Sequence, residues 1–300
     1  MRCFRYNETV RLKIIQLGET KVWLKKTIET VRGTFEYFVC GQGEPMAITH
    51  LYSQYDERGN AFANPFTKYF TVYLINLRGV GNSDVAVDQS QYSMVETVKD
   101  LEAMREAFGF EQWAFGGHST GGMLALQYSI QTPESLTKMV ACCTAASYEY
   151  AISEQCIYSE KNPNFHRVME IMNMLSNPET PIEQRKKLGY EWELLSFYRE
   201  EKLIEALKKP NSGKTVGARL TYFRQVEYRK MDFREQLKHI KVPSYILAGR
   251  HDTQCPVQFG IEIAELIPNA HFKIFEESNH FPFLEEEDAF DEFVLDFIEN

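Results

Sequence analysis

Residues 117–121 read GHSTG and contain the residue types of a nucleophilic site. A serine hydroxyl is a useful nucleophile only when a base takes its proton. The apolar residues 113–115 precede this segment, and a helical pattern begins at Met123. A G-x-S-x-G pattern between a strand and a helix predicts a tight turn, because small neighbours leave room for a strained serine. We therefore expect Ser119 to project from the sheet edge, with the Thr120 N–H directed into the same space.

An acid and a base are expected after later strands, in the order serine, aspartate, histidine. The apolar run 244–248 is followed by GRHD, which contains Asp252. The run 271–275 is followed by EESNH, which ends at His280. Ligands of open α/β sheets bind at the carboxyl ends of the strands. The pattern predicts that His280 is the general base and that Asp252 orients its ring and stabilises the imidazolium.

Other candidates for these roles are less well placed. A phosphate-binding loop would require G-K-[ST] or G-x-G-x-x-G, and neither occurs at residues 116–122. His118 lies inside the turn and is expected to point away from Ser119. His251 precedes a helix rather than following the last strand, and residues 144–147 after another apolar run offer no carboxylate.

An acyl-transfer site also needs two hydrogen-bond donors for the developing oxyanion. Thr120 N–H is the first expected donor. The second is expected from the loop after the predicted strand 47–51. We predict the N–H of Tyr52, with that of Leu51 as the alternative.

Short apolar runs alternate with helical patterns, which is typical of a mostly parallel sheet covered by helices. A hairpin is predicted at 27–31 and 34–39. Further predicted strands and helices are the strands 47–51, 69–76, 112–115, 139–145, 244–248 and 271–275, and the helices 93–108, 256–266 and 286–298. The alternation fails between 147 and 228, where the pattern is helical and rich in aromatic residues. We predict an N-terminal extension over 1–26, a core domain over 27–146 and 229–300, and a helical cap over 147–228.

Composition limits the classes of partner. The chain has 300 residues, enough for a large buried core, and a net charge of -9. This charge argues against nucleic acid or an anionic membrane as a partner. No apolar run approaches membrane-spanning length and the N-terminus has no signal-like segment, so the expected location is the cytoplasm. The six cysteines show no zinc spacing and are expected to be reduced, and no metal or cofactor is predicted.

Taken together, these motifs resemble the α/β-hydrolase fold superfamily over about residues 27–298. LRGVGNS at 77–83 is similar to the R-G-x-G-x-S turn of that family. GHSTGG, GRHD and SNHFPFLEE stand where the family has its nucleophile, acid and base. The resemblance implies the α/β-hydrolase fold with an inserted helical cap, and a serine at position 119 excludes the dehalogenases, which have aspartate there.

Within the superfamily, the chain is most similar to the proline iminopeptidase-like branch. The pair Trp192-Glu193 in the predicted cap resembles a Trp-Glu pair of that branch, whose glutamate binds the free amino terminus of the substrate. The resemblance therefore implies substrate contacts for Trp192 and Glu193, whereas an ordinary solvated charge is the alternative for Glu193. The H-G-G-P-G loop of the branch is replaced by HLYSQ, and Glu227 is out of register with its second glutamate.

These patterns predict a serine hydrolase of small carboxylic esters or amides that works through an acyl-enzyme. The expected partner is a small-molecule or short-peptide substrate. Two alternatives remain open: an iminopeptidase-like aminopeptidase, and a ligand-binding or signalling member of the fold with little turnover.

Overall fold

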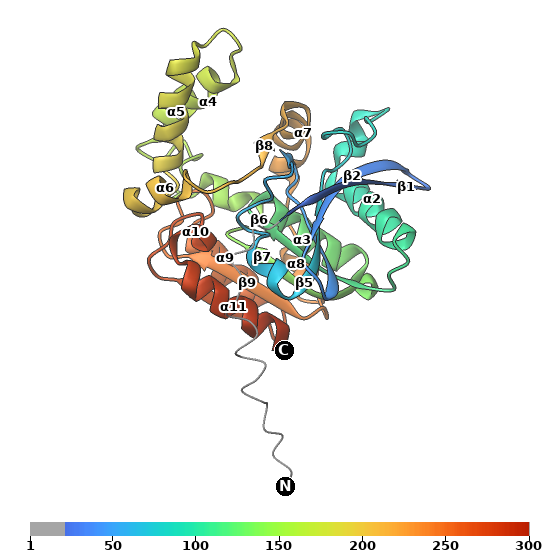
Figure 1. Cartoon of the computed structure of the whole chain (residues 1–300). Coiled ribbons are helices and arrows are strands. Elements are labelled where there is room, and N and C mark those ends of the chain that lie inside the picture. The colour runs from blue at the N-terminus through green and yellow to red at the C-terminus, as the bar shows by residue number, and fades with distance from the viewer. Residues whose placement is uncertain (1–21, 300) are drawn as a thin grey trace.

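A computed structural model describes residues 22–299, and its centre is an eight-stranded sheet (Figure 1). The strand order is β1-β2-β5-β3-β6-β7-β9-β10. The pairs β1–β2 and β2–β5 are antiparallel, and all other neighbours in this sheet are parallel. The strands are β1 (Leu24–Thr30), β2 (Gly33–Cys40), β3 (Glu44–Ile48), β5 (Phe70–Ile75), β6 (Trp113–His118), β7 (Leu136–Cys142), β9 (Ser244–Gly249) and β10 (His271–Phe275).

Helices cover both faces of the sheet, which explains why its central strands are apolar on both sides. One core cluster joins the sheet to α2 (Met94–Ala107), α3 (Thr120–Gln131), α8 (Arg234–Leu237) and α9 (Val257–Leu266). The cluster on the other face includes side chains of η1 (Pro65–Lys68), α10 (Pro282–Glu285) and α11 (Glu287–Glu299). The short 3-10 turns η2 (Gln89–Tyr92) and η3 (Pro133–Ser135) precede α2 and β7. This arrangement confirms the predicted α/β class with a mostly parallel sheet.

The segment between β7 and β9 holds most of the remaining helices. Figure 1 shows α4 and α5 standing away from the sheet, with α7 nearer to it. A two-stranded antiparallel pair links this cap to the core, because β8 (Lys214–Thr215) pairs with β4 (Ser53–Gln54). The cap elements are η4 (Tyr148–Ile152), α4 (Phe165–Ser176), α5 (Ile182–Leu194), α6 (Glu200–Ala206), α7 (Gly217–Tyr222), the π-helical turn η5 (Phe223–Glu227) and η6 (Tyr228–Lys230).

The predicted start of the core at residue 27 is wrong by a few residues. Strand β1 begins at Leu24, and Trp23 is buried and donates a hydrogen bond from its ring N–H to Asn64 Oδ1 at 3.1 Å. Most side chains of β1 are exposed because it is an edge strand, so the apolar signal there is weak. Residues 1–21, most of the predicted extension, lie outside the described residues.

Two further features of residues 22–299 concern the predictions about membrane-spanning segments and cysteines. None of the described helices combines the length and apolar character needed to cross a membrane. Cys142, Cys143, Cys156 and Cys255 are buried free thiols, and Cys3 lies outside this range.

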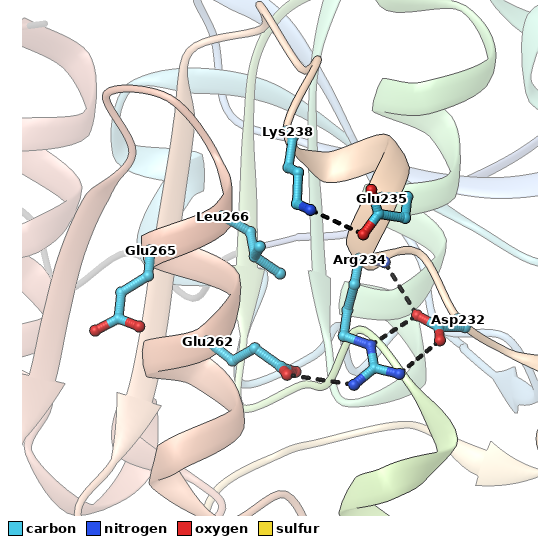
Figure 2. A pocket seen from close by; sticks show the side chains of 7 residues that line it. All are labelled: Asp232, Arg234, Glu235, Lys238, Glu262, Glu265 and Leu266. Carbon is cyan, nitrogen blue, oxygen red and sulfur yellow. Dashed lines mark hydrogen bonds and ion pairs between the residues drawn. The ribbon is translucent and has the colours of Figure 1, made fainter.

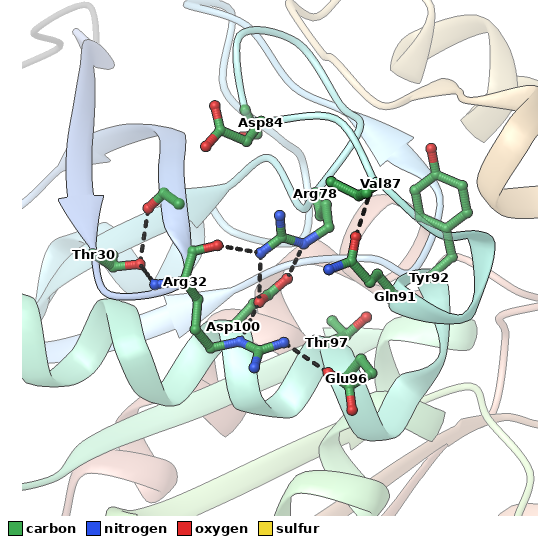
Figure 3. A network of polar contacts seen from close by, with 12 residues as sticks. Thr30, Arg32, Arg78, Asp84, Val87, Gln91, Tyr92, Glu96, Thr97 and Asp100 are labelled. Carbon is green, nitrogen blue, oxygen red and sulfur yellow. Dashed lines mark hydrogen bonds and ion pairs between the residues drawn. The ribbon is translucent and has the colours of Figure 1, made fainter.

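The LRGVGNS loop after β5 is held by a buried ion pair (Figure 3). Arg78 donates from Nε and an Nη to the two carboxylate oxygens of Asp100 on α2, each at 2.8 Å. The same carboxylate accepts a hydrogen bond of 2.6 Å from Arg32, in the turn between β1 and β2. Asp100 therefore ties the loop, the hairpin and α2 together.

We expect Asp100→Ala to lower the free energy of unfolding by about 3–5 kcal/mol, because it leaves the Arg78 guanidinium buried without its carboxylate. Urea denaturation followed by tryptophan fluorescence measures this change. The control is Glu96→Ala, which removes a partly exposed partner of Arg32 and is expected to cost less than about 1 kcal/mol. Equal losses for the two variants would contradict the assigned role of Asp100.

Candidate active site

Ser119 occupies the turn between β6 and α3 with a left-handed backbone, φ 56° and ψ -121°. An L-residue takes such a conformation only where the surroundings enforce it. The Ser119 N–H donates to the Cys142 carbonyl at 2.9 Å. Its own carbonyl accepts from the Thr144 hydroxyl at 2.8 Å and from the Gly122 N–H at 2.9 Å. The end of β7 thus fixes the serine in the predicted position at the sheet edge.

The glycines around Ser119 are required by close backbone approach. A Cβ on Gly117 would lie 2.0 Å from the Gly121 carbonyl oxygen, and one on Gly121 would lie 2.4 Å from that of Thr49. A Cβ on Gly122 would lie 2.7 Å from the Thr144 Cβ. β6 extends to His118, beyond the predicted end at 115, because glycine can continue a strand where no side chain fits.

Asp252 and His280, predicted on separate loops, lie in direct contact. Asp252 follows β9, His280 follows β10, and both are buried. The His280 Nδ1 lies 2.9 Å from Asp252 Oδ2 and 3.0 Å from Oδ1. Asp252 Oδ1 also accepts hydrogen bonds from the N–H groups of Gln254 and Cys255, both at 2.8 Å. These bonds fix the carboxylate and leave His280 Nε2 as the nitrogen available for proton transfer.

The cap helps to hold the two loops together. The His280 N–H donates to the carbonyl of Ser196 at 3.1 Å, and the Thr253 hydroxyl donates to that of Leu195 at 2.7 Å. Gly249 makes the close approach possible, because a Cβ there would lie 1.8 Å from the Asn279 carbonyl oxygen. The loops that carry Asp252 and His280 are therefore positioned by both the sheet and the chain after α5.

His118 packs against His280 rather than projecting into empty space. The two ring centroids are 4.5 Å apart, and His118 Nε2 lies 2.7 Å from the His280 carbonyl oxygen. Burial, followed by the nearby His280, lowers the pKa of His118 well below its usual value. In the described part of the chain, no hydrogen bond joins the Ser119 hydroxyl to His280. The neighbouring His118 does contact the His280 ring.

A group of possible metal ligands lies at the same place. Among the described residues, the donor atoms of His118, Cys143 and His280 lie within 4.8 Å of one another. The imidazoles already engage Asp252 and the His280 carbonyl, and burial raises the pKa of the Cys143 thiol well above its usual value, which disfavours the thiolate that a metal needs. We assign no metal to this group.

A third histidine organises the loop predicted to carry the second oxyanion donor. His50 Nε2 lies 3.0 Å from the Thr120 hydroxyl, and His50 Nδ1 lies 2.9 Å from the Ser53 hydroxyl. Burial, with smaller effects from His280 and Arg219, lowers the pKa of His50 to about 3. The ring is therefore neutral in the working range of pH. The Thr120 side chain, which had no predicted role, joins this loop to the start of α3.

Arg219 of the cap is a residue that motif analysis missed. Its side chain is fully buried, and its Nε donates to the Leu51 carbonyl at 2.5 Å. Its terminal nitrogens donate to the Arg78 carbonyl at 3.0 Å and the Thr97 hydroxyl at 2.8 Å. Burial lowers its pKa to about 10, so the guanidinium remains charged at neutral pH. The sequence could have pointed to this role only through the position of Arg219 on the apolar side of a short helix.

The loop differs from its predicted form in one respect. β3 ends at Ile48, not at 51, and Thr49 donates its hydroxyl hydrogen bond to the Ile75 carbonyl at 2.8 Å. Leu51 is buried, and its backbone φ is not positive. The next peptide group is also held by the cap, because the Val216 N–H donates to the Tyr52 carbonyl at 2.8 Å.

Ser119, Thr120 and Tyr52 lie at the wall of a cavity of about 480 Å³ between the core and the cap. Seven aromatic residues line it: Tyr52, Tyr148, Tyr150, Tyr158, Phe165, Phe223 and Tyr228. Burial raises the pKa of each of the buried phenols Tyr150 and Tyr158 well above its usual value. The cavity therefore offers neutral aromatic surface with hydroxyl groups next to the serine.

The two cap residues predicted to contact substrate lie beside this cavity. Trp192 packs against Tyr158 with ring centroids 6.1 Å apart, and neither Trp192 nor Glu193 is among the residues that line the cavity. Burial raises the pKa of Glu193, and its interaction with His280 opposes that shift. Glu227 has a structural contact, because its carboxylate accepts from the Met94 N–H at the start of α2 at 2.8 Å.

Comparison with known proteins places this architecture in a family. Residues 42–287 match the model of a family described as alpha/beta hydrolase fold. A solved alpha/beta fold family hydrolase from Bacillus anthracis is 57% identical, with a TM-score of 0.91 over 92% of this chain and 99% of that one. A proline iminopeptidase from Saccharolobus solfataricus is 26% identical over 74% of this chain and 73% of its own length. A pimeloyl-[acyl-carrier protein] methyl ester esterase from Vibrio cholerae is 24% identical over 86% of this chain and 96% of its own length.

The buried neutral His50 predicts acid-sensitive stability. Its pKa is about 3 in the fold and about 6.5 in an unfolded chain, so the unfolded state binds more protons as the pH falls below 6.5. We expect His50 alone to lower the free energy of unfolding by about 2 kcal/mol between pH 7.5 and pH 5. Urea denaturation of wild type and His50→Gln at both pH values measures this, and the variant should lose about 2 kcal/mol less. The exposed His166→Gln serves as a control, and an unchanged pH dependence in His50→Gln would contradict the prediction.

Proposed function

Because the chain belongs to the α/β-hydrolase fold family, we propose that it is a serine hydrolase of small carboxylic esters or amides. The observation that carries the proposal is the buried Asp252–His280 pair at the sheet edge where Ser119 takes its left-handed conformation. The family has many activities, so the proposal depends on these residues rather than on the fold. Relatives named as an esterase and as iminopeptidases support hydrolysis of a carbonyl compound.

In the proposed reaction, the Ser119 oxygen attacks the substrate carbonyl carbon while its proton passes to His280 Nε2. The tetrahedral intermediate collapses, His280 returns the proton to the leaving alcohol or amine, and the acyl group remains on Ser119. Water then attacks the acyl-enzyme and gives its proton to His280. A second collapse releases the carboxylic acid and restores the serine hydroxyl. Asp252 stays ionised and stabilises the imidazolium in both halves.

The oxyanion donors that we propose are the N–H groups of Thr120 and Tyr52. Thr120 opens α3, whose N-terminus favours negative charge. The Tyr52 N–H donates a long hydrogen bond of 3.4 Å to His50 Nδ1, which an oxyanion would replace as acceptor. It belongs to the same peptide group as the Leu51 carbonyl, which accepts from Arg219. In a trans peptide the two groups point in opposite directions, so a donor bound to the carbonyl fixes the direction of the N–H. Arg219 is thus a positioning residue that links the cap to the oxyanion site.

The test of the nucleophile compares wild type with Ser119→Ala on p-nitrophenyl acetate and with a fluorophosphonate probe. We expect wild type to turn over and label, and the variant to lose labelling and at least about 10³-fold in kcat/KM. Ser176→Ala, at the exposed end of α4, is the matched control and should behave as wild type. Equal labelling of wild type and Ser119→Ala would reject the nucleophile.

The same assays separate the alternative functions. Glu193, with its pKa raised by burial and its position near His280, is the observation that favours an iminopeptidase. Cleavage of prolyl-naphthylamide without cleavage of p-nitrophenyl acetate would support that activity over the esterase. Labelling of Ser119 followed by a single slow turnover of either substrate would support a ligand-binding role.

We expect Arg219→Lys to lower kcat by about 10- to 100-fold with little change in KM, because a lysine cannot hold Leu51 and Arg78 at once and the Tyr52 N–H loses its alignment. Affinity for a trifluoromethyl ketone, which forms a tetrahedral adduct, should fall in proportion to kcat/KM. The control is Thr97→Ala, which removes another Arg219 partner without touching the loop. If both variants lose stability but retain affinity for the ketone, Arg219 has only a structural role.

A further inference from the structure

The rim of the catalytic cavity is cationic, although the protein carries a net charge of -9. Arg224, Arg229 and Lys161 line the cavity that contains Ser119, and all three are exposed. Glu160 is the one acidic residue among the described residues that line it. An acidic protein that gathers positive charge around one opening attracts anions to that opening.

Among the described residues, the side chains of the two rim arginines, Arg224 and Arg229, form no ion pair or hydrogen bond. Every other arginine within residues 22–299 forms an ion pair or donates a side-chain hydrogen bond. A second hollow of about 320 Å³ beside α8 and α9 provides the contrast (Figure 2). There, Arg234 lies between Asp232 and Glu262, and Lys238 pairs with Glu235. Both cations of that hollow are paired with carboxylates, whereas within residues 22–299 Arg224 and Arg229 form no ion pair.

Both arginines lie where the π-helical turn η5 passes into the 3-10 turn η6, Arg224 in the first and Arg229 in the second. The Tyr228 N–H donates to the Phe223 carbonyl five residues earlier. Residues five apart in an α-helix differ by about 140° around the axis, but the wider π turn brings them near one face. The cavity wall accordingly contains the pair Phe223 and Tyr228 and the pair Arg224 and Arg229. The aromatic pair and the cationic pair of this segment therefore both face the cavity.

Arg224 is electrostatically connected to the reacting end of the cavity. Burial raises the pKa of the Tyr52 phenol to about 12, while a hydrogen bond with Thr120 and the positive charge of Arg224 oppose this rise. Tyr52 and Thr120 flank Ser119 in the cavity wall. A substrate bound at Ser119 therefore lies within the field of this guanidinium.

We propose that the substrate is an ester that carries a carboxylate, which Arg224 and Arg229 receive while the aromatic wall holds the apolar part. Lys161 adds positive charge to the same opening. Guanidinium groups suit this role because their planar donors match a carboxylate. This inference rests on the proposed function, since it names the substrate class of the same site.

The test measures kcat/KM on two matched pairs of esters. Monomethyl adipate against methyl hexanoate places the carboxylate on the acyl chain, and 4-acetoxybenzoate against 4-tolyl acetate places it on the leaving group. We expect the anionic member of at least one pair to be preferred, and the preference to shrink as salt rises from about 20 to 500 mM because salt screens exposed charges. In Arg224→Gln/Arg229→Gln the ratio should fall by about 3- to 10-fold, mainly through KM, as expected for two exposed ion pairs.

Arg58→Gln/Arg167→Gln is the matched control, because it removes the same charge from exposed residues that do not line the cavity and should leave the ratio unchanged. The proposal is overturned if wild type prefers the neutral ester of both pairs, or if the cavity and control variants change the ratio equally. Hydrolysis of neither member of either pair would instead reject the proposed esterase function. Circular dichroism of each variant establishes that it is folded.

Discussion

The left-handed backbone of Ser119 imposes the conditions that the surrounding structure satisfies. Such a conformation costs of order 1–3 kcal/mol and persists only under constraint. The Cys142 carbonyl and the Thr144 hydroxyl bind its two peptide groups, and Gly117 and Gly121 let the strand, the helix and the Thr49 carbonyl approach it. The parallel strands end at a common edge of the sheet, which is why the loops after β3, β9 and β10 lie at the same edge as Ser119.

The cap covers the site, and its residues also form hydrogen bonds with the loops that make up the site. Arg219 donates to the Leu51 carbonyl, and the Val216 N–H donates to the Tyr52 carbonyl. The loop after β3 is therefore held by α7 and by the residue before it. The carbonyls of Leu195 and Ser196 accept hydrogen bonds from the acid and base loops. A shift of the cap would therefore displace both the loops that carry Asp252 and His280 and the proposed oxyanion donor.

Features with a local sequence cause were predictable, and features that depend on tertiary contact were not. The strand-turn-helix pattern locates Ser119, and the residues after two apolar runs locate Asp252 and His280, because parallel strands end at a common edge. The boundary at residue 27 failed because an exposed edge strand has no apolar alternation. The part played by Arg219 depends on chain segments far apart in sequence, and a π turn leaves no mark on helical periodicity.

Three histidines lie close together, and burial separates their roles. His118 and His50 both have pKa values lowered chiefly by burial, so they remain neutral near His280. A charged His118, with its ring 4.5 Å from that of His280, would oppose the imidazolium by about 3–4 kcal/mol at an effective dielectric constant of about 20. That penalty would slow the proposed reaction by more than about 100-fold. The Asp252 carboxylate lies 2.9 Å from His280 Nδ1, so in the proposed reaction the neutral neighbours and this carboxylate both stabilise the imidazolium.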